Sequence, residues 1–146
     1  MDSFANQKVK ALLMPQNFTA DQDGILLDVR DYTGIAQVVM FCTEDASLGI
    51  TNLLDATIHN ISSDSVTTAA ANLVATLPQV VAQNAGSPVV VERRISVNLD
   101  ALDERYLQVK FDETNTWEGE ICVFIVMSGN RSGPVNTASN KDTGGA

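Results

Sequence analysis

The chain has 146 residues, of which 45% are hydrophobic and 18% are charged, and its net charge is −9 at pH 7. This length suits one domain with a sizeable core, and this composition excludes a chain that is disordered throughout. The lysines and arginines are scattered, with only Arg93 and Arg94 adjacent. Because basic side chains supply most of the affinity for nucleic acid, we expect no nucleic-acid partner.

The apolar segments are too short to predict a membrane partner. No apolar run reaches the roughly 18 residues that a membrane-spanning helix needs. The first residues, MDSFANQKVKALLMPQ, lack the apolar stretch of a secretory signal. We therefore expect a protein that is neither anchored in a membrane nor exported by such a signal.

The first 24 residues carry little periodic signal. Residues 1–20 mix polar and apolar types, which predicts an N-terminal arm with at most one short strand over residues 11–14. DQDG at 21–24 begins like a calcium-binding loop, but its glycine stands fourth rather than sixth and no glutamate closes the loop at the twelfth position. We interpret DQDG as a turn.

The next segments are predicted to be strands joined by turns. Residues 25–30 alternate apolar and polar side chains, which is typical of a half-buried strand. IAQVVMFCT at 35–43 is almost wholly apolar and rich in β-branched and aromatic residues, which predicts a central strand covered on both faces. Residues 50–62 are more apolar on one parity than on the other, which favours a further strand.

Residues 63–77 could form a short helix. Ser63 and Asp64 could cap it, five apolar residues follow at helical spacing, and Pro78 would end it. The threonines and valines of the segment weigh against a helix, so we leave its conformation open. Residues 78–88 then have the composition of a loop, with NAGSP as its strongest turn signal.

The second half of the chain contributes three more predicted strands. Residues 89–99 and 105–111 alternate in hydrophobicity, and EICVFIVMSG at 120–129 is apolar almost throughout. Between the last two strands, DETNTWEG at 112–119 predicts a longer turn. The residues that follow, from 130 to 146, are rich in Gly, Ser, Asn and Thr, and we expect them to form a polar arm.

The whole pattern is about six to eight short strands separated by turns. It predicts an all-β fold: an antiparallel β-sandwich of jelly-roll type, with at most one short helix and extended terminal arms. We place the N-terminal arm at 1–20, the sandwich domain at 21–129 and the polar C-terminal arm at 130–146.

The stretch DALDE holds three carboxylates in five positions, Asp100, Asp103 and Glu104. Such a cluster could mark a metal site or a catalytic site. The alternative is a turn, because alternating strands are predicted on both sides and aspartates readily hydrogen-bond to their own backbone in turns. No histidine or cysteine lies nearby in sequence to complete a metal site. We therefore interpret DALDE as a turn at the end of the sandwich.

His59 is the only histidine, and a Ser-His or Cys-His centre would have to use it. The chain carries no G-x-S-x-G nucleophile signature and no glycine-rich phosphate loop. One histidine and two distant cysteines are too few for the three or four ligands of a usual zinc site. We therefore predict that the protein is not an enzyme, with no catalytic, metal-binding or cofactor-binding residues and no cofactor.

Three further side chains have open assignments. Cys42 and Cys122 lie in apolar segments, where they are interpreted as reduced core cysteines, although a disulfide between neighbouring strands remains an alternative. Trp117, the only tryptophan, lies in a polar turn. It could be a lid over one end of the sandwich or an anchor for a partner.

Three stretches carry a family resemblance: ILLDVRDYTGIAQVVMFC, ISVNLDALDERYLQVKF and IVMSGNRSGP. In order, they contain an aliphatic–Asp strand with a Tyr-x-Gly turn, an apolar strand leading to Arg-Tyr-aliphatic-x-Val, and the end of a last strand. Over about residues 20–133 the chain resembles small virion proteins of tailed bacteriophages. The long polar tail and the extended segment 62–88 depart from that pattern.

The resemblance implies a β-sandwich protein that is a structural component of the phage particle. It points first to a capsid decoration (cement) protein that binds and stabilises the head shell, and alternatively to a neck or tail protein. The expected partners are the major capsid protein or other virion proteins, together with a homo-oligomer in which a trimer is favoured. The expected location is the virion, after synthesis in the host cytoplasm.

Two residues are candidates for the interface of such a protein, Trp117 and Val135, the latter the one core-forming residue of the C-terminal arm. A different class of function uses Trp117 as well. A carbohydrate-binding β-sandwich module would stack a sugar on this indole, although such sites usually show several exposed aromatic residues and the chain has an aromatic content of only 5%.

Overall fold

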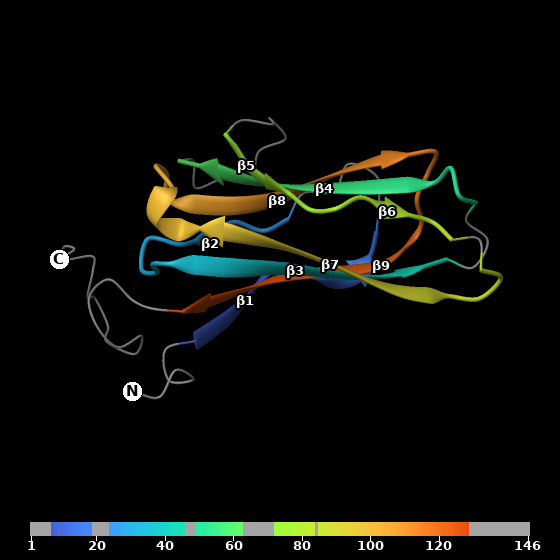
Figure 1. Ribbon diagram of the computed structural model, residues 1–146, viewed down its shortest axis with the longest axis horizontal. Coiled ribbons are helices and arrows are strands. Elements are labelled where there is room, and N and C mark those ends of the chain that lie inside the picture. Colours follow the sequence, from blue (N-terminus) through green and yellow to red (C-terminus); the bar gives the residue numbers. More distant parts are fainter. Residues whose placement is uncertain (1–6, 19–23, 46–48, 63–71, 84, 129–146) are drawn as a thin grey trace.

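The computed structural model describes residues 7–18, 24–45, 49–62, 72–83 and 85–128, which form two antiparallel β-sheets (Figure 1). Sheet A has the spatial order β1 (Gln7–Asn17), β9 (Gly119–Ser128), β3 (Ile35–Glu44) and β7 (Val89–Asn98). Sheet B has the order β2 (Leu27–Asp28), β8 (Tyr106–Thr114), β4 (Leu53–Ile61) and β5 (Leu73–Thr76), and β6 (Val80–Val81) also pairs with β4. The helical structure of the described residues is a single 3-10 turn, η2 (Leu99–Ala101).

The connectivity is that of a jelly roll. Because β5 and β6 both pair with β4, they act as one interrupted strand, and the nine strands reduce to eight. Numbered along the chain on that basis, sheet A has the order 1-8-3-6 and sheet B the order 2-7-4-5. This strand order is the double Greek key of jelly rolls. The predicted all-β antiparallel sandwich of jelly-roll type is therefore confirmed.

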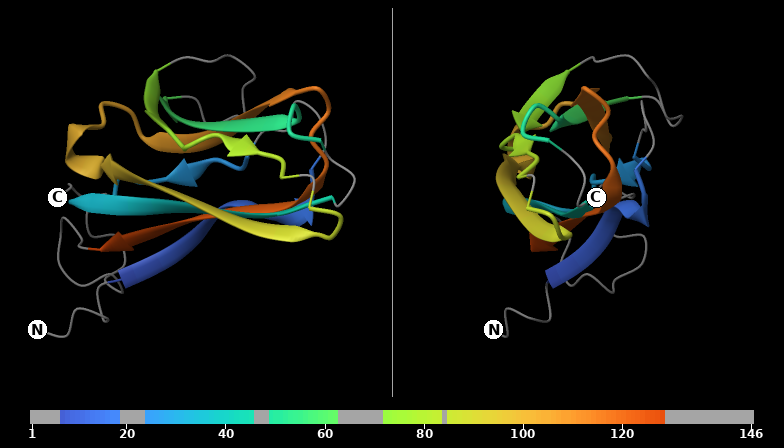
Figure 2. Two further views of the ribbon diagram at one scale, coloured as in Figure 1. Left: turned by 45° about the vertical axis from the view of Figure 1, so that its right-hand side comes forward. Right: turned by 90° about the vertical axis from the view of Figure 1, so that its right-hand side faces the viewer.

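The core fills the space between the inner faces of the two sheets, which face each other in both views of Figure 2. Alternate side chains of β3 and β9 point inward from sheet A, as the strand period of two requires. They meet the inward side chains of β4 and β8 from sheet B. The fully buried members of this core include Val38, Met40, Val123, Ile125, Leu54, Ile58, Leu107 and Val109.

The first strand lies within the segment that the sequence predicts to be an N-terminal arm. β1 pairs with β9 from Gln7 opposite Ser128 to Asn17 opposite Glu120, and two of its leucines, Leu12 and Leu13, are buried. The pairing register shifts after Ala11 and again after Leu13. Each shift breaks the alternation of inward and outward side chains, so β1 lacks the period-two pattern that marks the other strands.

The short helix considered for residues 63–77 is wrong in its second half. Residues 63–71 lie outside the described part of the chain, but Leu73–Thr76 form β5, which pairs with β4. The backbone N–H of Leu77 then donates to the carbonyl oxygen of Ala56 (2.9 Å). Pairing with a strand that is distant in sequence therefore outweighs the local helical spacing. The C-terminal arm, 130–146, is likewise outside the described residues.

Other boundaries differ by a few residues. The strand predicted over 25–30 pairs only at Leu27–Asp28, and β6 lies where a loop was predicted. β8 continues to Thr114, into the segment predicted to be a turn. Among the described residues, no helix is long and apolar enough to cross a membrane.

Candidate functional site

The acidic stretch DALDE forms a turn at one end of the sandwich, as the sequence predicts. η2 covers its first two residues, and the side chain of Asn98 caps η2 by accepting a hydrogen bond from the backbone N–H of Asp100 (3.1 Å). The Asp100 carboxylate accepts another from the backbone N–H of Gly34 (3.2 Å). Asp100 therefore ties η2 to the turn that precedes β3.

Asn60 holds the other end of this turn. It lies on β4 and is only 4% exposed. Its Oδ1 accepts a hydrogen bond from the backbone N–H of Glu104 (2.8 Å), and its Nδ2 donates to the carbonyl oxygens of Glu104 and Tyr106 (both 2.9 Å). The sequence offered no signal for this role, because the bonded groups lie 44 and 46 residues away.

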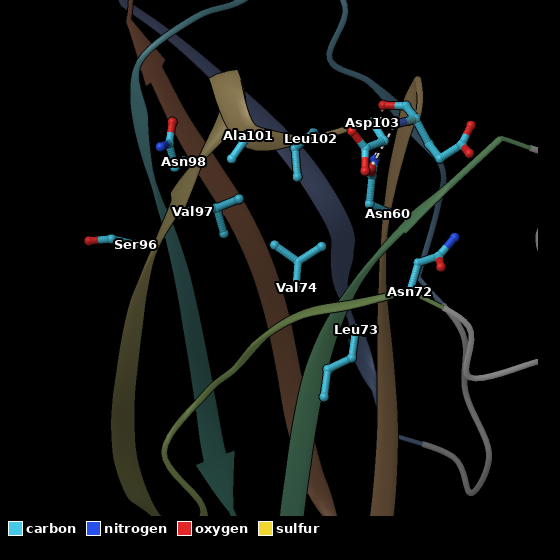
Figure 3. A pocket seen from close by; sticks show the side chains of 11 residues that line it. Asn60, Asn72, Leu73, Val74, Ser96, Val97, Asn98, Ala101, Leu102 and Asp103 are labelled. Carbon is cyan, nitrogen blue, oxygen red and sulfur yellow. Dashed lines mark hydrogen bonds between the residues drawn. The ribbon is translucent and has the colours of Figure 1, made fainter.

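A pocket of about 470 Å³ lies beside the turn, between β5 and β7 (Figure 3). Val74 and Leu102 project into it as apolar side chains, and Asp103 lies at its margin. The Asn60 amide and the Asn98 side-chain oxygen, which also line it, are engaged by the turn itself. No group of three or more His, Cys, Asp and Glu side chains is placed to hold a metal ion in the part of the chain that the structure describes.

His59 is enclosed on the outer side of sheet B. It is 3% exposed, and its Nε2 lies 2.8 Å from Oγ1 of Thr57 on the same strand. Opposite it on β8 stands Gln108, which is fully buried. These contacts give the histidine a packing role within sheet B.

Trp117 lies inside the molecule rather than on its surface. It is 1% exposed, and its ring meets Phe18 edge to face, with centroids 5.6 Å apart and planes at 82°. A side chain at Gly119 would bring a Cβ atom within 2.7 Å of the indole ring, so glycine is required there. This burial agrees with the interpretation of Trp117 as a lid over one end of the sandwich. It leaves no exposed indole for a partner or a sugar. Val135, the other candidate interface residue, lies outside the described residues.

A buried carboxyl group lies next to this lid. Glu44, at the end of β3, is 3% exposed. Burial raises the pKa of its carboxyl group, while the Gln83 backbone, Arg93 and the Trp117 indole act in the opposite direction. The native fold therefore favours the protonated form of this side chain more than the unfolded chain does.

The two cysteines are free and lie on opposite faces of sheet A. Cys42 pairs in register with Ile121 and Cys122 with Phe41, so the two cysteines are offset by one residue on adjacent strands. Neighbouring residues of a strand point to opposite faces, which keeps the sulfur atoms apart. Cys42 is buried, and burial together with the nearby Glu44 raises its pKa to about 12. Cys122 is half-buried on the outer face instead of lying in the core.

The outer face of sheet A carries a continuous set of apolar side chains. The register aligns Val9 with Val126, Ala11 with Phe124 and Val39, and Phe41 with Cys122. The rings of Phe41 and Phe124 stack with centroids 5.8 Å apart. Val9 is 62% exposed at the edge, whereas Val39, at the centre, is 4% exposed between larger neighbours. We call this set the apolar face; it consists of Val9, Ala11, Val39, Phe41, Cys122, Phe124 and Val126.

The outer face of sheet B is polar by contrast. There the register sets Asp55 opposite Asp112 and Thr57 opposite Lys110. An antiparallel sheet with one solvated face normally presents polar side chains to water. The Asp55–Asp112 and Thr57–Lys110 rows of sheet B follow this rule, while sheet A departs from it. The prediction that residues 35–43 are covered on both faces arises from the apolar side chains on both sides of β3. The core covers one side of β3, and the apolar face is the other.

No protein-family model matches the chain, and no curated protein does. Among solved structures it is similar to VP2 of infectious bursal disease virus in a subviral particle, with a TM-score of 0.50 and 12% identity over 84% of this chain and 32% of VP2. VP2 of the Gx strain of that virus has a TM-score of 0.49 and 12% identity over 85% of this chain and 32% of VP2. Latent PorU from Porphyromonas gingivalis has a TM-score of 0.47 and 12% identity over 86% of this chain and 13% of PorU.

The chain thus spans about a third of the length of the VP2 structures that it matches. At 12% identity, the likeness to the subviral-particle structure concerns the fold alone. It places the sandwich among β-sandwich domains of the kind found in that particle protein. Matches with lower TM-scores add nothing to this conclusion.

Proposed function

We propose that this chain is a structural component of a virion, and specifically a decoration (cement) protein on the capsid of a tailed phage. The observation that carries the proposal is the apolar face, which lies on the outside of a complete jelly roll. Apolar surfaces of this kind usually mark sites of protein–protein contact. The likeness of the fold to VP2 in a subviral particle and the segments that resemble tailed-phage virion proteins support the same class of function.

A weak contact is sufficient for this role. Burial of apolar surface contributes about 25 cal/mol per Å² before the costs of association are subtracted, so one small face gives a modest affinity. On a symmetric shell the same contact is repeated at every equivalent position, and linked copies reinforce one another. The partners in this proposal are the major capsid protein or other virion proteins, together with further copies of this chain. A neck or tail position in the same particle would use the same face.

The test is the binding of purified protein to purified particles that lack it. We expect the wild type to decorate the particles and to raise the temperature at which they release their genome. Phe124→Ser, on the apolar face, should bind much less, whereas Ile50→Ser, on a turn and 68% exposed in the wild type, should bind normally. Circular dichroism should show that both variants keep the fold.

Two results would count against the proposal. One is the absence of the protein from purified wild-type particles when these are imaged or dissociated. The other is equal decoration by the wild type and by Phe124→Ser. Deletion of residues 130–146 provides an independent test of the arm, since we expect it to weaken attachment while leaving the sandwich folded.

A further inference from the structure

We propose that the apolar face of one copy packs against the same face of a second copy, sheet A upon sheet A, about a twofold axis. This inference rests on the proposed function in one respect: further copies of the chain are among the partners proposed for this face. The dimer is the form of the free protein, and attachment to a particle would replace the second copy at this face. An isologous contact requires a surface that complements itself. It also closes at two copies, so it favours a dimer over the trimer that the sequence analysis expects.

The charge beside the apolar face allows a second copy as the partner. The chain carries a net charge of −9, so two copies repel each other over most of their surfaces. Beside the apolar face, on β7, Arg94 and Glu92 form an ion pair (2.6 Å), which leaves that margin locally neutral. This neutral margin lowers the repulsion at the apolar face, while the net charge of both copies still opposes their association. A basic partner would instead be drawn to the acidic surfaces.

The whole outer surface of sheet A, which comprises the apolar face and the polar side chains of β7 beside it, is large enough for a dimer. Sheet A has four strands, each of ten or eleven residues. At about 4.8 Å between strands and about 3.4 Å per residue, its outer surface measures roughly 600 Å². Two such surfaces would bury about 1,200 Å² in total, which is at the lower end of specific interfaces. Because both copies carry a charge of −9, which opposes association, we expect a dimer of micromolar rather than nanomolar strength.

The β1 edge of sheet A argues against strand addition on that side and thus for face-to-face packing. β1 is an edge strand, and it carries Lys8, Lys10 and Pro15 together with two register shifts. Lysine, proline and bulges are the usual devices that prevent one sheet edge from pairing with another. Among the described residues, no such device protects the central rows of the apolar face, where Phe41 and Phe124 lie. Two sheets that pack on these rows would lie about 10 Å apart, as in other sandwiches.

Sedimentation velocity on the full chain, without particles, tests the contact directly. We expect a reversible dimer at micromolar concentration. Val9→Glu and Phe124→Glu should each raise the dissociation constant at least about tenfold, because each places a charge in an apolar contact. Val9 is 62% exposed, so its variant keeps the fold even if Phe124→Glu does not. Ile50→Glu, 68% exposed on a turn, should dimerise like the wild type.

Cys122 supplies a second readout from the native sequence. It lies on the apolar face, whereas Cys42 is buried on the inner side with a pKa raised to about 12. A flexible bismaleimide should therefore link two copies through Cys122 alone, and Val9→Glu or Cys122→Ser should abolish the link.

A monomeric wild type, or a dimer or trimer that neither substitution weakens, would overturn this inference. If such a protein still decorated particles through Phe124, the proposed function would stand without the dimer. If the dimer formed but no particle bound the protein, the proposed function would fail and the dimer would stand.

Discussion

Replacement of Trp117 should reveal how much the lid contributes to the stability of the sandwich. The indole is 1% exposed and packs edge to face against Phe18, which packs in the same manner against Phe111 (centroids 5.8 Å apart). This aromatic group closes the end of the core where β8 and β9 are connected. Trp117→Ala would leave a cavity at this end of the core.

The expected loss follows from the size of the removed group. Substitution of a buried tryptophan or phenylalanine by alanine costs about 3–5 kcal/mol in free energy of unfolding. The edge-to-face contact with Phe18 adds to the loss, so the upper half of that range applies. Trp117→Phe keeps an aromatic ring in contact with Phe18, and we expect about half the loss of the alanine variant.

Urea denaturation followed by circular dichroism gives these values, since removal of the only tryptophan eliminates the fluorescence signal. Native wild-type emission should be shifted to the blue of the unfolded chain, as for a buried indole. Trp117→Phe should decorate particles as well as the wild type does. A loss below about 1 kcal/mol for Trp117→Ala, with defective attachment by folded Trp117→Phe, would mean that the indole serves a partner instead of the core.

Asn60→Ala removes three hydrogen bonds to the DALDE turn and should lower the free energy of unfolding by about 2–3 kcal/mol in urea titrations. Asp103→Ala, at an exposed position of the same turn, should change it little. Equal losses would contradict the role of Asn60. Burial raises the folded-state pKa of Glu44 above 4.5, so its contribution to stability falls as pH rises from 4.5 through that folded pKa. Glu44→Gln should therefore gain on the wild type in urea midpoint as pH rises to neutrality, and parallel curves would refute this. Because the pKa of Cys42 is about 12, a thiol reagent at neutral pH should label one cysteine per native chain and two after denaturation; rapid labelling of both in the native protein would be inconsistent with the buried thiol.

The long strands with an even register are predictable from this sequence, and the strands with register shifts are not. β3 pairs with β7 and β9 without interruption, and its residues follow one rule of alternation from end to end. β1 shifts twice, and β5 shifts once against β4. Leu73, the first residue of β5, also fits a helical spacing with Leu77 and with apolar residues before it, and only the pairing with β4 decides between the two structures. That information is nonlocal, so no window of sequence contains it.

The same limit applies to the candidate site. The composition of residues 35–43 predicts a strand covered on both faces, and the apolar face lies there. However, its members Val9, Val39 and Val126 come from three strands, and only the register places them together. Trp117 illustrates the converse case. It lies among polar residues in sequence, yet Phe18, about a hundred residues earlier, brings it into the core.

The apolar face should contribute to association and hardly at all to folding, and β9 contains a matched pair of residues that separates the two. Val123 points into the core and is fully buried, whereas Val126 lies on the apolar face. Val→Thr conserves shape and replaces a methyl group by a hydroxyl. At position 123 the hydroxyl would be buried in an apolar core, and we expect a loss of about 1–3 kcal/mol in free energy of unfolding.

At position 126 we expect a change within about 0.5 kcal/mol when the chain is dilute enough to be monomeric. Dimer formation should show the reverse order, weakened by Val126→Thr and unchanged by Val123→Thr wherever that variant is folded. Equal losses of stability at both positions would show that the outer side of sheet A is a second part of the core. The apolar side chains on the outer side of sheet A would then serve the folding of this chain of charge −9. The argument that they contact a partner would lose its basis.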